Sequence, residues 1–212
     1  MCIRDRQNTD QLILFARAPI YGRVKQRLAR DIGKSTALDF YSDTLTSTIA
    51  RLQCGPWNLS VSVATPGDEH HRVFNGITTI VQTPGDLGAR MRCSLDSHNN
   101  CKRIIIGSDI PDIQPRHVEY AFALLSSHDL VFGPATDGGF WLVGCGADQE
   151  QTDQTFMHNV RWSGPHALAD TLKSVPAGKS VATASTLSDV DDKNAYQDYL
   201  QRSDVRPLAG VR

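Results

Sequence analysis

The chain has 212 residues, 40% of them hydrophobic, and its 22 lysine and arginine residues nearly balance 23 aspartate and glutamate residues. A chain of this length and apolar content can bury one core. The net charge of -1 gives it no general attraction for nucleic acid or an anionic membrane. No apolar run approaches the ~20 residues of a membrane helix, and no signal-peptide core follows the start. We therefore expect a soluble, cytoplasmic protein whose anion sites are local.

The first six residues, MCIRDR, match the translation of a transposon end that is used in sequencing libraries. We interpret residues 1–6 as translated adapter DNA and take residues 7–212 as a single domain. The remaining cysteines, Cys54, Cys93, Cys101 and Cys145, show no C-x-x-C spacing. This pattern favours buried, reduced thiols over a zinc site or a redox pair.

Apolar runs bounded by glycine or proline predict strands, and apolar residues at three- and four-residue steps predict helices. In chain order these are a strand at 12–16, a helix with its stripe over 38–52, strands at 59–64 and 77–81, a helix over 87–95, a strand at 103–107, a helix from 115, strands at 130–132 and 140–143, a helix from about 165, a strand at 181–187 and a helix within 189–201. This alternation predicts an α/β, Rossmann-like fold with a mixed, mostly parallel sheet flanked by helices. Ligands of such sheets bind beyond the carboxyl ends of the strands, so the loops after the strands are the candidate sites.

The loop after the first strand concentrates positive charge. Within RAPIYGRVKQRLAR lie five cations, namely Arg17, Arg23, Lys25, Arg27 and Arg30. Arginine and lysine side chains bind phosphate oxygens, so phosphate is the natural partner of this loop. A solvated helix face is the alternative interpretation. Neither the G-x-x-x-x-G-K-[ST] loop nor the G-x-G-x-x-G loop is present, which disfavours a P-loop NTPase or a dinucleotide-binding dehydrogenase.

The stretch RIIIGSDIPD places Asp109 at the end of an apolar strand, where an unpaired carboxylate is costly to desolvate. A hard divalent cation held by carboxylate and phosphate oxygens would neutralise it. The alternative is a helix cap: Asp109 or Asp112 could cap the helix that starts near Pro115, and Asp112 is the nearer of the two.

Two further acidic loops follow later strands. In GPATDGG, Asp137 precedes two glycines and could be the Asx residue of a hairpin turn, or a group that binds an acceptor hydroxyl or acts as a base. In LSDVDD, one or two of Asp189, Asp191 and Asp192 could complete a metal shell, with helix capping as the alternative for the others.

The order of these loops resembles a known family. Arg17 to Leu28, Gly85 to Met91, Gly107 to Pro111, Gly133 to Trp141, Trp162-Ser163 and Asp189 to Asp191 are similar to the motifs of DUF2064, a family of glycosyltransferase-A-like nucleotide-diphospho-sugar transferases. The resemblance implies that Arg17, Lys25 and Arg27, with Gly22 in the same loop, bind the nucleotide diphosphate. It implies that Asp86 and Arg90 lie at the nucleotide or sugar edge, that Asp109 is a metal ligand with a catalytic role, and that Asp137 is a catalytic residue on the acceptor side. Of the three acids in LSDVDD, we take Asp191 as the second metal ligand.

From the residues and the resemblance together we expect a transferase that depends on Mg2+ or Mn2+ and moves a sugar from a nucleotide diphosphate sugar to a small acceptor. The alternative is a guanylyltransferase-like nucleotidylyltransferase that releases pyrophosphate. A third class, a non-catalytic nucleotide-sugar binder, would bind nucleotide without turnover. The resemblance names a nucleotide sugar and a small-molecule acceptor as partners, and no nucleic acid.

Overall fold

The computed structural model describes residues 9–98, 100–148 and 152–204, so the interpretation of residues 1–6 lies outside the described residues. The described elements are β1 (Gln11–Ala16), α1 (Gln26–Ile32), α2 (Lys34–Leu52), β2 (Asn58–Val63), η2 (Asp68–His70), η3 (Arg72–Phe74), β3 (Thr78–Val81), α3 (Leu87–Asp96), β4 (Arg103–Gly107), α4 (Pro115–Leu124), β5 (Leu130–Pro134), β6 (Phe140–Cys145), α5 (Ala167–Lys173), β7 (Val181–Thr183) and α6 (Lys193–Asp204). Each predicted strand and helix therefore corresponds to an element of the structure.

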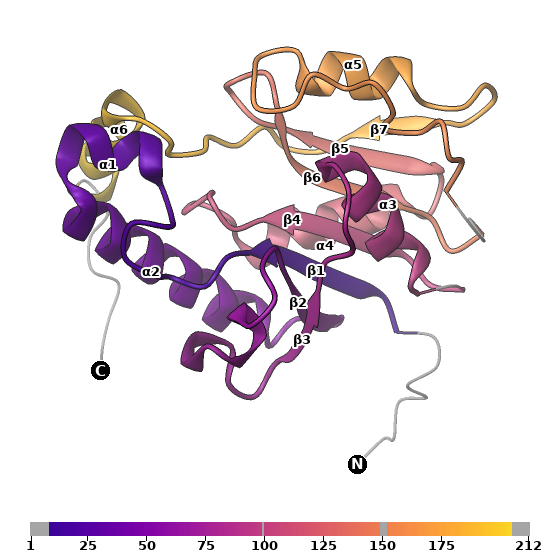
Figure 1. Ribbon diagram of the computed structural model, residues 1–212. Coiled ribbons are helices and arrows are strands. Elements are labelled where there is room, and N and C mark those ends of the chain that lie inside the picture. The colour runs from indigo at the N-terminus through magenta and orange to yellow at the C-terminus, as the bar shows by residue number, and fades with distance from the viewer. Residues whose placement is uncertain (1–8, 99, 149–151, 205–212) are drawn as a thin grey trace.

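The strands form one seven-stranded sheet in the order β3-β2-β1-β4-β6-β5-β7 (Figure 1). All pairs are parallel except those of β6, which runs antiparallel to both β4 and β5. The predicted mixed, mostly parallel sheet is confirmed. Because six strands point the same way, the loops that follow them gather at one edge of the sheet.

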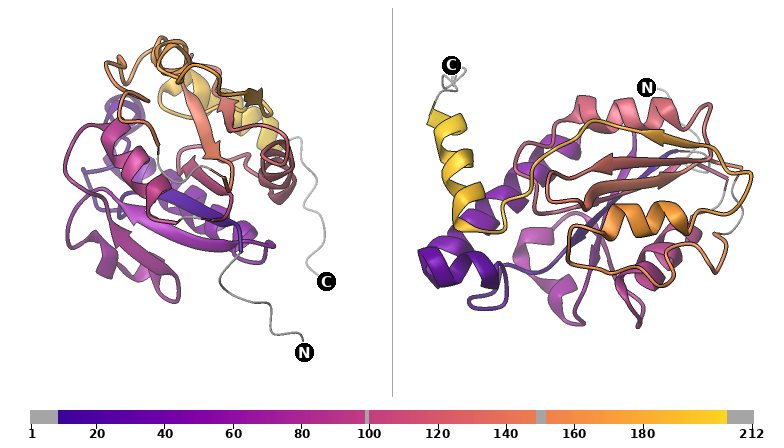
Figure 2. Two further views of the ribbon diagram at one scale, coloured as in Figure 1. Left: turned by 90° about the vertical axis from the view of Figure 1, so that its right-hand side faces the viewer. Right: turned by 90° about the horizontal axis from the view of Figure 1, so that it is seen from above.

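Both faces of the central sheet are covered, which explains why β1 and β4 contain continuous apolar runs. On β1, Leu12 and Leu14 face a core cluster that includes residues of α2 and α4, whereas Ile13 faces a second cluster with residues of α3. Partly buried Leu168 of α5 packs against that second cluster. Two turned views show these helices on either side of the sheet (Figure 2).

A third apolar cluster joins α1 and α2, early in the chain, to α6 and the segment before it. Leu28 of α1 and Phe40 of α2 pack with Val190, and Tyr196 and Tyr199 of α6 contact Phe40 ring to edge. In Figures 1 and 2, α1 and α6 lie beside each other at one end of the molecule. This packing brings the segment before α6 next to the basic loop.

Two sequence expectations differ from the structure in detail. The basic loop continues into a separate helix, α1, because Gly33 adopts φ 88 and interrupts the path into α2. The last predicted strand is shorter, since β7 ends at Thr183 and Leu187 only forms an isolated bridge with Ala135.

Within the residues described, no helix combines the length and apolar character needed to cross a membrane.

The cysteines divide into two classes. Cys101 and Cys145 are buried, as expected, whereas Cys54 and Cys93 are exposed, so the expectation of buried thiols is wrong for these two. Their positions explain the error: Cys54 follows the end of α2, and Cys93 lies on the solvent side of α3. Burial raises the pKa of the Cys145 thiol to about 11, although the nearby Arg103 guanidinium opposes this shift.

Candidate functional site

A cavity of about 670 Å3 lies at the edge of the sheet where β1 to β4 end. Its lining includes five cations, namely Arg17, Arg23, Lys25, Arg27 and Arg90, and two acids, Asp109 and Asp191. We call this space the cation cavity. It brings together six of the predicted site residues from loops that are far apart in the sequence.

Lys25 lies between the two acids. Its Nζ is 3.1 Å from Oδ1 of Asp109 and 2.5 Å from Oδ1 of Asp191, and only 4% of its side chain is exposed. Burial by itself would lower the pKa of Lys25, but the charges of Asp109 and Asp191 and their hydrogen bonds raise it above its ordinary value. The ammonium therefore stays charged and holds the two carboxylates together.

The two carboxylates have the donor chemistry that a shared metal site requires. About half of each side chain is exposed, 49% for Asp109 and 48% for Asp191, and both reach the same ammonium. Among the described residues no group of three His, Cys, Asp or Glu side chains forms a metal-holding cluster. Mg2+ commonly takes one or two protein carboxylates and fills its shell with substrate phosphates and water. Asp109 and Asp191 therefore fit an ion held jointly with a phosphate ligand, and do not form a complete protein cage.

The cations of the cavity differ in what they bind. Arg23 Nη1 lies 3.5 Å from Oδ1 of Asp68, and Arg90 Nη1 donates to Oε1 of Gln82 at 2.9 Å. Within the described ranges, the guanidinium groups of Arg17 and Arg27 make no hydrogen bond or ion pair to the protein, and both residues are exposed. These two guanidinium groups can therefore bind an anion without breaking an existing contact.

Two buried residues that the sequence analysis missed hold the loop after β1. The Tyr41 hydroxyl accepts a hydrogen bond from the Arg17 amide at 3.1 Å and donates to the Arg17 carbonyl at 3.0 Å. It also lies 3.1 Å from Oγ of Ser108 in the loop after β4. Asp68, only 4% exposed, accepts from the Ala18 amide at 3.1 Å. Tyr41 belongs to the predicted apolar stripe of α2, where its hydroxyl was the one signal that it needs a polar partner.

Two residues that were predicted to bind the nucleotide lie outside the lining of the cation cavity. Asp86 is exposed and caps α3, where its Oδ1 accepts from the Ala89 amide at 2.8 Å. Gly22 lies in the turn before α1 with φ 73, a left-handed conformation that favours glycine. The structure thus places Gly22 as a turn residue and Asp86 as a helix cap, and their contact with a nucleotide stays a prediction.

The cap alternative for Asp109 and Asp112 is wrong. Gln114 is the N-cap of α4 and forms a capping box with His117. Asp112 instead lies 3.6 Å from Nη1 of Arg202. Asp109 is thus left to face the cation cavity.

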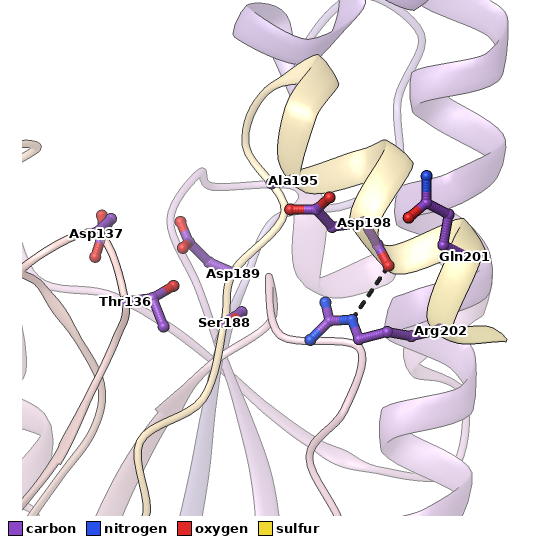
Figure 3. Close-up of a pocket in the computed structure, with 8 residues that line it drawn as sticks. All are labelled: Thr136, Asp137, Ser188, Asp189, Ala195, Asp198, Gln201 and Arg202. Carbon is purple, nitrogen blue, oxygen red and sulfur yellow. Dashed lines mark hydrogen bonds between the residues drawn. The ribbon is translucent and has the colours of Figure 1, made fainter. Parts of the chain in front are cut away.

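Asp137 lies at the tip of the β5–β6 hairpin, outside the lining of the cation cavity. Its Oδ1 accepts from the Gly139 amide at 2.8 Å, so it forms the predicted Asx turn. It lines a second cavity of about 670 Å3, together with Asp189 of the segment before α6 (Figure 3). Burial, followed by the charges of Asp137 and Asp191, raises the pKa of Asp189 to about 6.

Asp192 caps α6, because its Oδ1 accepts a hydrogen bond from the Ala195 amide at 3.0 Å. Helix capping was one of the alternatives predicted for this acid.

Several solved structures share this fold, and two of them contain a bound nucleotide. A protein from Desulfovibrio desulfuricans G20, provisionally described as a nucleotide-diphospho-sugar transferase, matches with a TM-score of 0.80 at 23% identity, over 95% of this chain and 90% of that chain. A CMP:2-keto-3-deoxy-manno-octonic acid synthetase complexed with CTP matches with a TM-score of 0.59 at 12% identity, over 93% and 100% of the two chains. Glucosyl-3-phosphoglycerate synthase from Mycobacterium tuberculosis, in complex with Mn2+, UDP and glucosyl-3-phosphoglycerate, matches with a TM-score of 0.53 at 14% identity, over 92% and 75%. These matches show that the fold is the glycosyltransferase-A-type, Rossmann-like fold predicted from the sequence.

The sequence itself was compared with functionally curated proteins and with family models. The search of curated proteins finds no match. One family model matches residues 45–164, more than half of the chain, and it includes the loops that hold Asp109 and Asp137. The chain therefore belongs to DUF2064, a family described as uncharacterised proteins conserved in bacteria.

Proposed function

We propose that this protein is a glycosyltransferase that moves a sugar from a nucleotide diphosphate sugar to a small acceptor. The observation that carries the proposal is the cation cavity. In it, the exposed guanidinium groups of Arg17 and Arg27 line the same space as the Asp109–Lys25–Asp191 cluster. A nucleotide diphosphate has the two features that this arrangement suits, since its phosphates take arginine donors and share a cation with carboxylates.

The residues of the cavity act mainly on the leaving group. Negative charge grows on the diphosphate as the bond from C1 of the sugar to the diphosphate oxygen breaks, and its electron pair stays on that oxygen. Arg17 and Arg27 bind this charge with guanidinium groups that need not break a contact to the protein, and such cations at the developing charge lower the barrier. Tyr41 keeps the backbone of Arg17 in position through its two hydrogen bonds.

Asp109 and Asp191 are the residues that would hold a divalent cation, Mg2+ or Mn2+, beside the diphosphate. When bound, such an ion supplies Lewis-acid stabilisation of the leaving diphosphate. Lys25 pairs with both carboxylates and can donate to a phosphate oxygen once they turn to another partner.

The proposal is tested by the products that the protein releases. The full chain is incubated with UDP-glucose, GDP-mannose or ADP-glucose, with a mixture of simple hydroxyl acceptors and either MnCl2 or EDTA. Release of nucleoside diphosphate with Mn2+ and its loss with EDTA are the expected results. The variants Arg17→Met and Arg27→Met should each weaken nucleoside diphosphate binding, and Arg72→Met, an exposed arginine outside the cavity, is the matched control.

A nucleotidylyltransferase is the second candidate, because a cavity lined by five cations would also accept a nucleoside triphosphate. That reaction would attack the α-phosphorus and release pyrophosphate instead of a nucleoside diphosphate. Incubation with each nucleoside triphosphate and a sugar phosphate, followed by a pyrophosphate assay, separates the two reactions. Nucleotide-dependent thermal stabilisation without any turnover would instead indicate a binding protein.

A further inference from the structure

A smaller cavity of about 230 Å3 adjoins the cation cavity. Both are lined by Phe15, Leu87, Gly107, Trp162 and Ser163, so they share a wall. At about 30 Å3 per water molecule, the smaller space holds roughly eight waters, which suits one small ring and not a nucleotide. We call it the aromatic cavity, because Phe15, Phe140, Trp141 and Trp162 contribute to its lining.

The two adjoining cavities have opposite charge. The aromatic cavity has one charged residue in its lining, Asp137, and none of the described residues that line it is lysine, arginine or histidine. The cation cavity next to it has five cations. An anion that entered the aromatic cavity would meet a carboxylate and the negative faces of aromatic rings, with no cation to replace its lost hydration.

The walls of the aromatic cavity are fixed by close packing. A Cβ at Gly88 of α3 would lie 2.4 Å from the Met157 carbonyl oxygen and 3.0 Å from the Trp162 ring, so only glycine allows this approach. The rings of Phe140 and Trp162 pack edge to face at 6.3 Å. The indole N–H of Trp162 is buried and has no acceptor in the part of the chain that the structure describes. This nitrogen is out of reach of a ligand in the cavity, so the wall is defined by the close packing at Gly88 and by the Phe140–Trp162 contact.

Resting on the proposed function, we propose that the aromatic cavity takes the acceptor and that this acceptor is an uncharged, hydroxyl-bearing ring rather than a phosphorylated compound. Its apolar face packs on the rings of Phe140 and Trp162, and one hydroxyl faces Asp137. That hydroxyl oxygen forms the new bond to C1 of the sugar while the bond from C1 to the diphosphate breaks. The electron pair of the broken bond stays on the diphosphate, and the hydroxyl proton passes to the Asp137 carboxylate.

The test compares two probes that share one pyranose ring and differ in charge. Methyl β-D-glucoside is neutral, and glucose 6-phosphate is anionic. Saturating inorganic pyrophosphate and Mg2+ are present to fill the cation cavity, and their binding is first measured by calorimetry. Saturation-transfer NMR then gives the affinity of each probe. We expect the glucoside to bind at least about tenfold more tightly than glucose 6-phosphate, a difference of ~1.4 kcal/mol.

Variants locate the binding. Phe140→Leu and Trp162→Leu should each weaken glucoside binding at least about fivefold, and Asp137→Asn should weaken it while glucose 6-phosphate binding rises. Tyr120→Leu, at an exposed tyrosine of α4 outside both cavities, is the matched control and should bind the glucoside like the wild type. Circular dichroism confirms that each variant is folded, and the two aromatic variants serve as backups for one another.

The outcomes separate the inference from the function on which it rests. Equal binding of the two probes, or tighter binding of glucose 6-phosphate, with pyrophosphate still bound, would overturn the uncharged acceptor and leave the glycosyltransferase proposal standing. Glucoside binding that the Phe140 and Trp162 substitutions leave unchanged would overturn the placement of the acceptor. Failure of pyrophosphate to bind would instead count against the cation cavity and the proposed function itself.

Discussion

The ammonium of Lys25 and the carboxylate of Asp191 lie 2.5 Å apart, although 166 residues separate them in the chain. Lys25 comes from the basic loop before α1, and Asp191 from the segment before α6. Asp109 reaches the same nitrogen from the end of β4. One ammonium thus joins three loops that together form the floor of the cation cavity.

Asp109→Asn should lower metal-dependent turnover roughly 100- to 1,000-fold, because it removes an oxygen charge from the group that faces the leaving diphosphate. The measurement is the rate of nucleoside diphosphate release with Mn2+. Asp112→Asn is the matched control, since Asp112 pairs with Arg202 outside the cavity and should keep nearly wild-type turnover. Wild-type turnover in Asp109→Asn would remove Asp109 from the mechanism.

Lys25→Met should destabilise the protein by roughly 1 to 3 kcal/mol, because it leaves Asp109 and Asp191 close together without the cation between them. Mn2+ should raise the thermal midpoint of this variant more than that of the wild type, since both carboxylates are then free for the ion. Differential scanning fluorimetry with and without Mn2+ measures both effects. Lys34→Met, at an exposed lysine, should show neither. A variant as stable as the wild type would mean that the cluster adds nothing to the fold.

Gly138→Ala should lower the free energy of unfolding more than Gly178→Ala does. Both glycines have positive φ, 89 and 83, so an alanine at either costs about 1 to 2 kcal/mol. At Gly138 the new Cβ would also lie 2.4 Å from the Pro165 carbonyl oxygen, whereas nothing lies within 4 Å at Gly178. We expect roughly 2 to 5 kcal/mol at Gly138, measured by urea unfolding. Equal costs would show that the hairpin tip can move away from Pro165.

Asp170 should stabilise the fold through an acid-sensitive contact. Hydrogen bonds from Arg161, at 2.7 Å from Nε and 3.0 Å from Nη2, lower the pKa of Asp170 to about 2. Because the pKa is lower in the folded state, Asp170 contributes to the free energy of unfolding above pH ~4, the ordinary pKa of an aspartate in an unfolded chain. This contribution is lost as the pH falls toward 2. The difference in thermal midpoint between wild type and Asp170→Asn should therefore be constant above pH ~4 and shrink below it. A difference that stays constant down to pH 2 would contradict this assignment.

The cysteines should react in two classes. Iodoacetamide at pH 8 should modify Cys54 and Cys93 in the folded protein, because both are exposed. Cys101 and Cys145 are buried, and burial raises the pKa of both thiols, so they should react only after unfolding. Peptide mapping by mass spectrometry after timed labelling measures each rate. Rapid labelling of Cys145 in the native state would mean that the β4–β6 region opens readily.

The sequence predicted the elements well where a local signal exists. The run Ile104, Ile105 and Ile106 is apolar because both faces of β4 are covered, and such runs identify buried strands. The collection of Arg17, Asp109 and Asp191 at one edge was also predictable, since it follows from the shared direction of the strands.

Other features had no local signal. The choice of Lys25 as the partner of Asp191 depends on how α1 packs against α6, which no short pattern encodes. The buried support from Tyr41 and Asp68 was missed for the same reason, because the periodicity of α2 marks Tyr41 only as a core residue. Gly33 was not recognised as a helix boundary, since a single glycine within a helical pattern is often tolerated.

The position of Asp191 so late in the chain also has a consequence for synthesis. A protein leaves the ribosome from its N-terminus, and its elements can begin to fold in that order. The basic loop and β4 are then made well before Asp191, so a nascent chain carries the arginines and Asp109 while Lys25 still lacks one of its two carboxylate partners. The cation cavity therefore acquires its full set of charged side chains only after Asp191 has been translated.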